Sequence, residues 1–137
     1  MIRYASDAAE IVPGHLVGFF EGWPNPPSPA THLRLLRSSS HFDVATTDSA
    51  RVVGFATAVS DGVLSAYIPF LEVLPDYRGR GIGRELVRRL VGQLRDIYSI
   101  NLHCDPELRP FYEQLGMRSL GGMAIRNYQK QCGAHAV

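Results

Sequence analysis

One stretch of the chain, residues 75–84 (PDYRGRGIGR), gathers the residue types that suit the binding of a phosphate. Its alternating glycines are Gly79, Gly81 and Gly83, and its arginines are Arg78, Arg80 and Arg84. Glycine lets a backbone approach a ligand closely and adopt positive φ. Guanidinium groups match phosphate oxygens two at a time. If a helix begins here, its unbonded N–H groups add partial positive charge, so the stretch predicts an anion-binding turn.

The known glycine fingerprints narrow the choice of phosphate ligand. The dinucleotide pattern GxGxxG fails, because its last position is Arg84 when counted from Gly79 and Leu86 when counted from Gly81. The P-loop pattern GxxxxGK[ST] is absent. A solvated turn before a surface helix is the simpler alternative, but it does not explain why three glycines and three arginines occur together at this junction.

The elements that would position this turn follow from periodicity. Apolar residues recur at helical spacing over residues 81–97, which predicts the clearest helix, and Arg88, Arg89 and Arg95 on it are expected to face solvent. Strands are expected at residues 2–5, 42–47, 51–60, 63–74 and 99–104, with a last strand or hairpin over 117–129. Further helices are expected at 11–20, 28–38 and 106–115, the last with Asp105 as its N-cap. Pro69 inside a strand predicts an edge, a bulge or an opening in the sheet. We therefore expect a mixed α/β fold whose mostly antiparallel sheet contains one parallel pair.

Composition excludes several classes of function. The chain has 137 residues, a size typical of one domain, and its 14 basic and 13 acidic residues leave a net charge of +1, which argues against a nucleic-acid partner. The five histidines are scattered without metal-ligand spacing, so no metal is expected. No apolar run approaches the roughly 20 residues that span a membrane, and no secretory signal is visible, so we expect a cytoplasmic protein without a membrane partner and with free Cys104 and Cys132.

Two segments carry a specific resemblance. Arg78-x-x-Gly81-x-Gly83, preceded by VLPDY, resembles the acetyl-CoA pyrophosphate loop of the GNAT superfamily of N-acetyltransferases. The stretch FYEQLGM at residues 111–117 resembles the family's FYExLGF helix, and the order of elements matches over residues 2–129. The resemblance implies one GNAT-like domain over residues 1–137, with a six- to seven-stranded sheet, a central splayed parallel pair and about four flanking helices.

The resemblance also implies a set of residues that bind acetyl-CoA (coenzyme A). The backbone of Leu71 and Val73 would pair with the pantetheine, and N–H groups of residues 79–84 would hold the pyrophosphate. The Val73 amide would polarise the thioester carbonyl. The full expected set is Leu71, Val73, Leu74, Arg78, Gly79, Arg80, Gly81, Ile82, Gly83, Arg84, Phe111 and Tyr112.

Tyr112 matches the family tyrosine that lies near the sulfur of the cofactor. A phenol stays protonated at neutral pH and can donate a proton to the departing thiolate. The base that takes the proton from the amine is less clear, because Pro69 and Tyr67 occupy the usual carboxylate positions. Glu72 is the only acid on that strand, and it is expected either as this base or as a rim ion pair; His103 and Asp105 are weaker candidates.

The predicted function is transfer of an acetyl group to a primary amine by direct attack. An acceptor wall is expected from Phe20, Trp23, Ser60, Asp61 and Tyr67. The acceptor is a small-molecule or a protein amine, and a homodimer is left open. The alternative is an acyl-CoA-binding sensor or regulatory subunit without turnover, a reading prompted by the missing carboxylate.

Overall fold

A computed structural model describes residues 1–134 of the chain. Its sheet has the order β1-β2-β3-β4-β5. The strands are β1 (Arg3–Ala5), β2 (His41–Thr46), β3 (Val52–Ser60), β4 (Ser65–Val73) and β5 (Ser99–Asn101). The first four strands pair antiparallel and only β4 and β5 are parallel. The α-helices of the described residues are α1 (Pro29–Ser38), α2 (Ile82–Gln93) and α3 (Arg109–Glu113).

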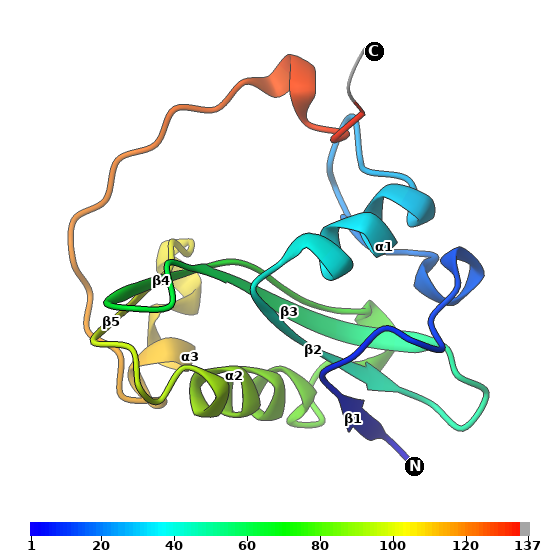
Figure 1. The fold of residues 1–137 in the computed structure, drawn as a ribbon, viewed down its shortest axis with the longest axis horizontal. Helices are drawn as coiled ribbons and strands as arrows, with labels where there is room; N and C mark the ends of the chain where they lie inside the picture. The colour runs from blue at the N-terminus through cyan, green and yellow to red at the C-terminus, as the bar shows by residue number, and fades with distance from the viewer. Residues whose placement is uncertain (135–137) are drawn as a thin grey trace.

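The helices α1 and α2 cover opposite faces of the sheet (Figure 1). Helix α1 begins where predicted, because the Ser28 side chain accepts the N–H of Thr31. Helix α2 buries an apolar stripe against the sheet. Gly54 on β3 permits this close packing, since a Cβ there would lie 3.0 Å from Leu86 and 3.2 Å from Ile82.

Strand β4 separates from β5 part of the way along its length. The parallel pairing joins only Ser65–Tyr67 of β4 to β5, whereas β4 continues to Val73. Two steps along β3, from Thr57 to Val59, match three steps along β4, so one extra residue bulges at 68–69. The prediction that Pro69 marks a bulge and an opening is confirmed.

Several expected elements are absent from the described residues. The sheet has five strands rather than six or seven, because residues 117–127 form no strand. Residues 11–20 form only the 3₁₀ helix Pro13–Leu16, since Pro13, Gly14 and a positive φ at Gly18 interrupt the predicted helix. Asp105 makes no side-chain cap for the 3₁₀ helix Pro106–Leu108 that precedes α3, so the predicted cap is wrong.

Arg88 and Arg89 of α2 were expected in solvent, and for Arg89 this prediction is wrong. Arg89 forms an ion pair with the fully buried Asp43 of β2, and its guanidinium lies over the ring of Tyr4. Burial raises the pKa of Asp43, and the hydrogen bond from Arg89 opposes that rise. Arg88 instead pairs with Glu85 at the surface. Arg89 thus links α2 to the sheet and is unavailable to a ligand.

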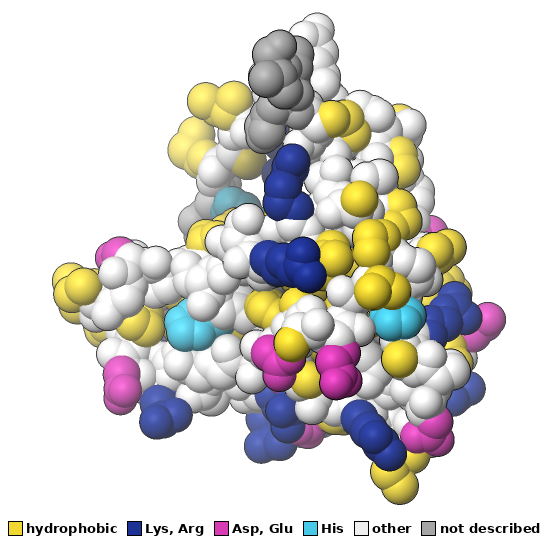
Figure 2. Space-filling model, turned by 45° about the vertical axis from the view of Figure 1, so that its right-hand side comes forward, with side chains coloured by type: hydrophobic (Ala, Val, Ile, Leu, Met, Phe, Trp, Pro, Cys, Tyr) yellow, Lys and Arg dark blue, Asp and Glu magenta, His cyan; other side chains and the backbone are white. Residues whose placement is uncertain are grey.

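Charges on the visible surface are mixed. On the face that Figure 2 shows, basic and acidic side chains alternate with hydrophobic ones instead of forming one basic stripe. No helix among residues 1–134 is long and apolar enough to cross a membrane. The same residues contain no cluster of three metal-ligating side chains.

Candidate active site

The glycine-rich turn lies between β4 and α2, as the sequence predicts. Gly79 and Gly81 adopt left-handed backbone conformations, with φ of +77° and +82°. A Cβ built on either would meet no atom of the described chain within 4 Å, so the space beside the turn is open there. Gly81 is the N-cap of α2 and its carbonyl accepts the N–H of Glu85, which leaves the N–H groups of residues 82–84 without helical partners. The turn therefore has the backbone geometry of an anion site.

The three arginines of the turn point in different directions. Arg78 donates from Nε to the Val73 carbonyl at 2.9 Å and from a terminal nitrogen to Glu21 at 2.8 Å. Arg80 donates to the Asp76 carbonyl and stacks on the ring of Tyr77. The predicted common cradle of three guanidinium groups is therefore not assembled in this structure, because two of them bond to the protein itself.

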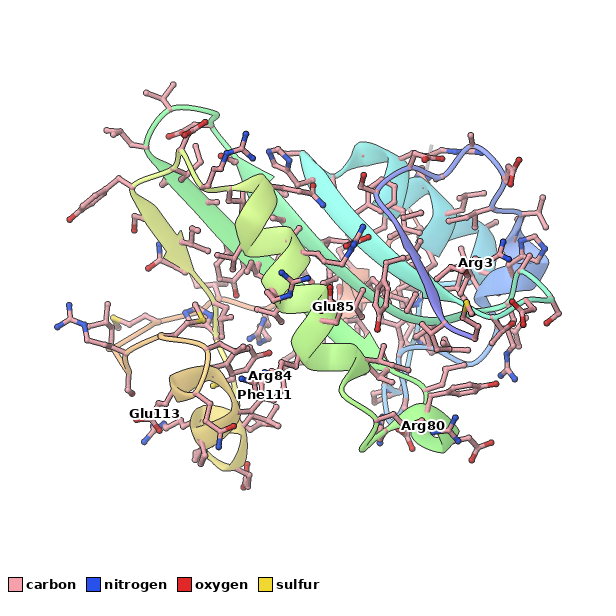
Figure 3. The ribbon with its side chains drawn as sticks, turned by 90° about the horizontal axis from the view of Figure 1, so that it is seen from below. Arg3, Arg80, Arg84, Glu85, Phe111 and Glu113 are labelled. Carbon is pink, nitrogen blue, oxygen red and sulfur yellow. The ribbon has the colours of Figure 1, made fainter. Side chains whose placement is uncertain are left out.

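Arg84 lies close to the next helix rather than to the other arginines. It projects from α2 toward Phe111 of α3, whereas Arg80 lies at the other side of the turn (Figure 3). The ring of Phe111 comes within 3.7 Å of a Cβ built on Gly83. Helices α2 and α3 therefore meet at the turn, which brings the two predicted motifs together.

The separated part of β4 presents unpaired backbone beside the turn. The Leu74 N–H donates to the Val53 carbonyl of β3 at 2.8 Å. Because successive residues of a strand direct their N–H groups to opposite edges, those of Val73 and Leu71 face the gap where β5 no longer pairs. The two residues expected to pair with pantetheine thus have the required orientation.

Tyr112 of α3 is a buried side chain at a large hollow. It is 9% exposed, and burial together with nearby Cys104 raises its pKa to about 12. The hollow has a volume of about 870 Å³ and is also lined by β5, His103 and residues that follow α3. Tyr112 therefore stays protonated at neutral pH and keeps a proton to donate.

An aromatic wall lies on the α1 face of the sheet. Phe20, Trp23 and Phe70 contact one another, with ring centroids 5.0 to 6.1 Å apart. Phe20 has a φ of +63°, an uncommon conformation for a bulky residue. Its N–H donates to the carboxylate of Glu72 at 2.9 Å, and the N–H of Glu21 donates at 3.3 Å. Glu72 thus fixes the segment that carries the wall.

Two other predicted wall residues lie where β3 ends, Ser60 as its last residue and Asp61 as the first residue of the turn to β4. One carboxylate oxygen of Asp61 accepts the N–H groups of residues 63, 64 and 65, which lowers the pKa of Asp61 to about 2. The Ser60 hydroxyl donates to the Ser65 carbonyl. Both side chains are used by the turn itself, far along β4 from the aromatic wall.

Sequence reasoning missed one pair of residues. The Tyr67 hydroxyl lies 3.0 Å from Nδ1 of His103, and the two rings meet edge to face. Tyr67 is the last residue of β4 that pairs with β5, and His103 follows the end of β5. The pair therefore lies where the two strands begin to separate. The residues are 36 positions apart, and no sequence signal joins them.

Comparisons with known proteins agree with this geometry. Residues 8–117 match the acetyltransferase (GNAT) family model. An uncharacterized N-acetyltransferase, ycf52, of Porphyra purpurea is 34% identical over 69% of this chain and 57% of its own length. The chloroplastic serotonin N-acetyltransferase 2 of Oryza sativa is 34% identical over 72% of this chain and 55% of its own length. The chain thus spans a little over half the length of these curated relatives.

Solved structures show the same fold. A putative acetyltransferase from Deinococcus radiodurans is 44% identical and superposes with a TM-score of 0.96, covering 98% of this chain and 94% of that one. A GNAT family protein from Streptococcus pneumoniae is 27% identical with a TM-score of 0.74, covering 93% of this chain and 98% of its own. With the family model matched over most of its length, the chain belongs to the GNAT family of acetyltransferases.

Proposed function

We propose that the protein transfers an acetyl group from acetyl-CoA to a primary amine. The observation that carries the proposal is the unpaired edge of β4, whose Val73 N–H faces the gap just before the open, glycine-rich N-terminus of α2. Such an arrangement offers main-chain donors for an extended amide chain and for a diphosphate at its end. When bound, acetyl-CoA supplies an acetyl thioester that an amine can attack.

The residues of the turn fit that cofactor. Nothing in the described protein occupies the space beside Gly79 and Gly81, and the N–H groups of residues 82–84 have no helical acceptors. These N–H groups would hold the diphosphate. Leu71 and Val73 would bond the extended amide arm, and the Val73 N–H would stabilise negative charge on the carbonyl oxygen during attack. Arg84 remains as the side chain free to approach a phosphate.

Tyr112 is proposed as the general acid. Attack by the amine breaks the carbon–sulfur bond, and the sulfur leaves with the electron pair. The phenol of Tyr112 donates its proton to that sulfur, a role that requires the hydroxyl to be protonated. Its pKa of about 12, raised mainly by burial, satisfies this requirement at every physiological pH.

The amine proton is proposed to pass to Tyr67 and His103. As the N–C bond forms, the Tyr67 oxygen accepts a proton from the amine nitrogen and passes its own proton to Nδ1 of His103. The 3.0 Å distance between the two atoms permits this transfer. Glu72 is then a positioning residue, because both of its oxygens accept backbone N–H groups of the aromatic wall.

The wall suggests the class of acceptor. Trp23 and Phe70, which are half-buried and pack on the buried Phe20, form an apolar surface, so we propose a primary amine with an apolar or aromatic body rather than a polycation. The name of the Oryza relative, a serotonin N-acetyltransferase, supports this choice. Ser60 and Asp61 are left out of the proposed wall, because the turn uses their side chains.

The test measures coenzyme A release with a panel of amines: serotonin, a linear polyamine and a lysine peptide. We expect turnover with serotonin, and a fall in kcat of about 10²-fold in Tyr112→Phe. Tyr128→Phe removes an exposed hydroxyl and serves as the matched control. Tight acetyl-CoA binding without turnover on any amine would favour the sensor instead.

A further inference from the structure

The segment after α3, residues 118–127, runs extended without pairing. Within the described chain no backbone N–H of residues 118–127 is bonded, and no carbonyl of residues 118–126 accepts a hydrogen bond. In Figure 1 it forms the long arc that leaves the molecule beside β5 and returns near α1. Extended chain of this length normally has a partner strand, because unpaired backbone in a fixed shape loses entropy without compensation.

This exchange segment, as we call residues 118–127, is apolar where it is most exposed. Leu120, Met123 and Ile125 are 74%, 97% and 101% exposed. Its charged residues, Arg118 and Arg126, lie near its two ends. A contiguous apolar stretch that is wholly exposed indicates a surface that another chain covers.

The exchange segment is held at both ends. It begins next to α3, and the residues that follow it bind near α1. There Arg34 donates to the Gly133 carbonyl at 2.7 Å, and the Asn25 N–H donates to the Gln131 side chain at 3.2 Å. The Deinococcus structure superposes over 98% of this chain at a TM-score of 0.96, a fit that includes the segment. Its extended course is thus a shared feature of two chains.

A complementary edge lies directly opposite. Strand β5 bonds to β4 along one edge, and its other edge has no strand partner among residues 1–134. Between that edge and the exchange segment lies the hollow of about 870 Å³. The segment touches the body at Gly122, where a Cβ would lie 2.5 Å from Nε2 of His103. Beyond that contact, the hollow separates two lengths of extended backbone, neither of which has a strand partner within residues 1–134.

We propose that a second copy of this chain fills the hollow. The exchange segment of the second copy would add to the free edge of β5 as a sixth strand, and the first copy's segment would do the same in return. The two segments would exchange between protomers related by a two-fold axis. Each exchanged strand would gain backbone hydrogen bonds and bury its apolar residues.

A second copy satisfies the geometry better than a different protein would. The structure supplies both the donor strand and the acceptor edge, so the contact between two copies is reciprocal and closed, with each copy giving and receiving one strand. The segment carries its charges near its ends and apolar residues between them, as expected of a strand whose central side chains are covered by a second copy.

The exchange would also complete the active site. The hollow is lined by His103 and Tyr112, so the partner's strand would form a wall beside the proposed acid and the proposed proton acceptor. A single copy would leave that side open to water.

Sedimentation velocity of the full chain at micromolar concentration tests the inference. We expect the wild type at twice 15.2 kDa and Ile125→Asp at 15.2 kDa. The control is Val63→Asp, which changes a residue 69% exposed in the turn between β3 and β4 and should stay dimeric. A wild type of 15.2 kDa, or an Ile125→Asp that sediments like the control, would overturn the proposal.

A crosslink tests the position of the exchanged strand. In a background with Cys104→Ser and Cys132→Ser, Asn101→Cys and Ile125→Cys are placed on separate chains of different tag length and co-expressed. Oxidation should yield a covalent species containing one chain of each kind. Replacing Ile125→Cys by Val63→Cys should abolish it. Equal crosslinking from both cysteines would contradict the exchange.

Discussion

The two sides of the opening in the sheet are built by different means. The cofactor side consists of backbone: a strand edge, two left-handed glycines and the start of α2. The acceptor side consists of side chains held from a distance, with Phe20 kept at a positive φ by Glu72, which lies 52 residues away in the sequence. The first is specified by a short contiguous stretch of sequence, whereas the second depends on the folded core. Substitutions should therefore affect the two sides differently.

The largest effect is expected at the cofactor side. Gly81→Glu should lower the affinity for acetyl-CoA by at least about 10²-fold, because it places a carboxylate where the diphosphate binds and strains a left-handed residue. Isothermal titration calorimetry measures the loss. Gly81→Ala separates strain from charge. Gly92→Glu, on the same helix and equally open, is the control and should bind normally. Unchanged affinity in Gly81→Glu would refute the assignment of the turn.

The next effect concerns the core behind the acceptor wall. His32 lies among Phe19, Phe20 and Phe55, and neither of its ring nitrogens bonds to any described residue. Burial lowers its pKa to about 4. The unfolded chain takes up this proton below about pH 6.5 and the folded chain does not. Stability contributed by neutral His32 is therefore full above pH 6.5 and falls as the pH drops toward 4.

Urea unfolding at pH 7 and pH 5 measures this effect. The wild type should lose about 2 kcal/mol more than His32→Phe over that interval. His41→Gln, which changes a half-buried histidine of β2, should behave as the wild type does. If the wild type and His32→Phe lose the same amount, His32 titrates normally and the core behind the wall is not sensitive to acid.

A smaller effect separates positioning from catalysis at Glu72. Glu72→Gln keeps one acceptor oxygen but places an amide against the other backbone N–H, so the Phe20 segment should loosen. We expect a rise in the acceptor KM of about tenfold with kcat and the pH profile nearly unchanged. Tyr67→Phe should instead lower kcat. A fall in kcat for Glu72→Gln at constant KM would make Glu72 the base.

The smallest effect is expected at Asp61. Its carboxylate accepts backbone N–H groups of the turn between β3 and β4, so Asp61→Asn should lower the melting temperature by a few degrees. The KM for the acceptor should stay within about twofold of the wild type. A larger rise in KM would return Asp61 to the acceptor wall. Calorimetry measures the melting temperature, and steady-state kinetics measures the KM for the acceptor.

The features that could be predicted from the sequence lie mainly on the cofactor side, which a contiguous stretch of the chain forms. The glycine-rich turn, α2 and the placement of Tyr112 on α3 were predictable, because each is encoded by residues adjacent in the chain. Pro69 likewise predicted the opening of the sheet. The pair of Tyr67 and His103 was not predictable, since only the meeting of β4 and β5 brings the two residues together.

Two wrong predictions share one physical origin, because each concerns a residue or segment whose partner lies far away in the sequence. Arg89 was expected in solvent together with Arg88 and Arg95, but a buried Asp43 on β2 requires a cation. Residues 117–129 were expected to form a strand because they are apolar and extended in character. That pattern specifies an extended chain but not the strand with which it pairs, so it does not locate a neighbour.

The bulge at residues 68–69 decides the direction in which Tyr67 points. Residues that pair across antiparallel strands share a face, and Tyr67, Phe70 and Glu72 pair with Val59, Thr57 and Phe55. Tyr67 thus faces the acceptor side only because β4 contains one extra residue. In an unbulged strand it would alternate with Phe70 and face α2. Deletion of one residue here would therefore move the Tyr67 hydroxyl from the acceptor side of the sheet to the face that α2 covers.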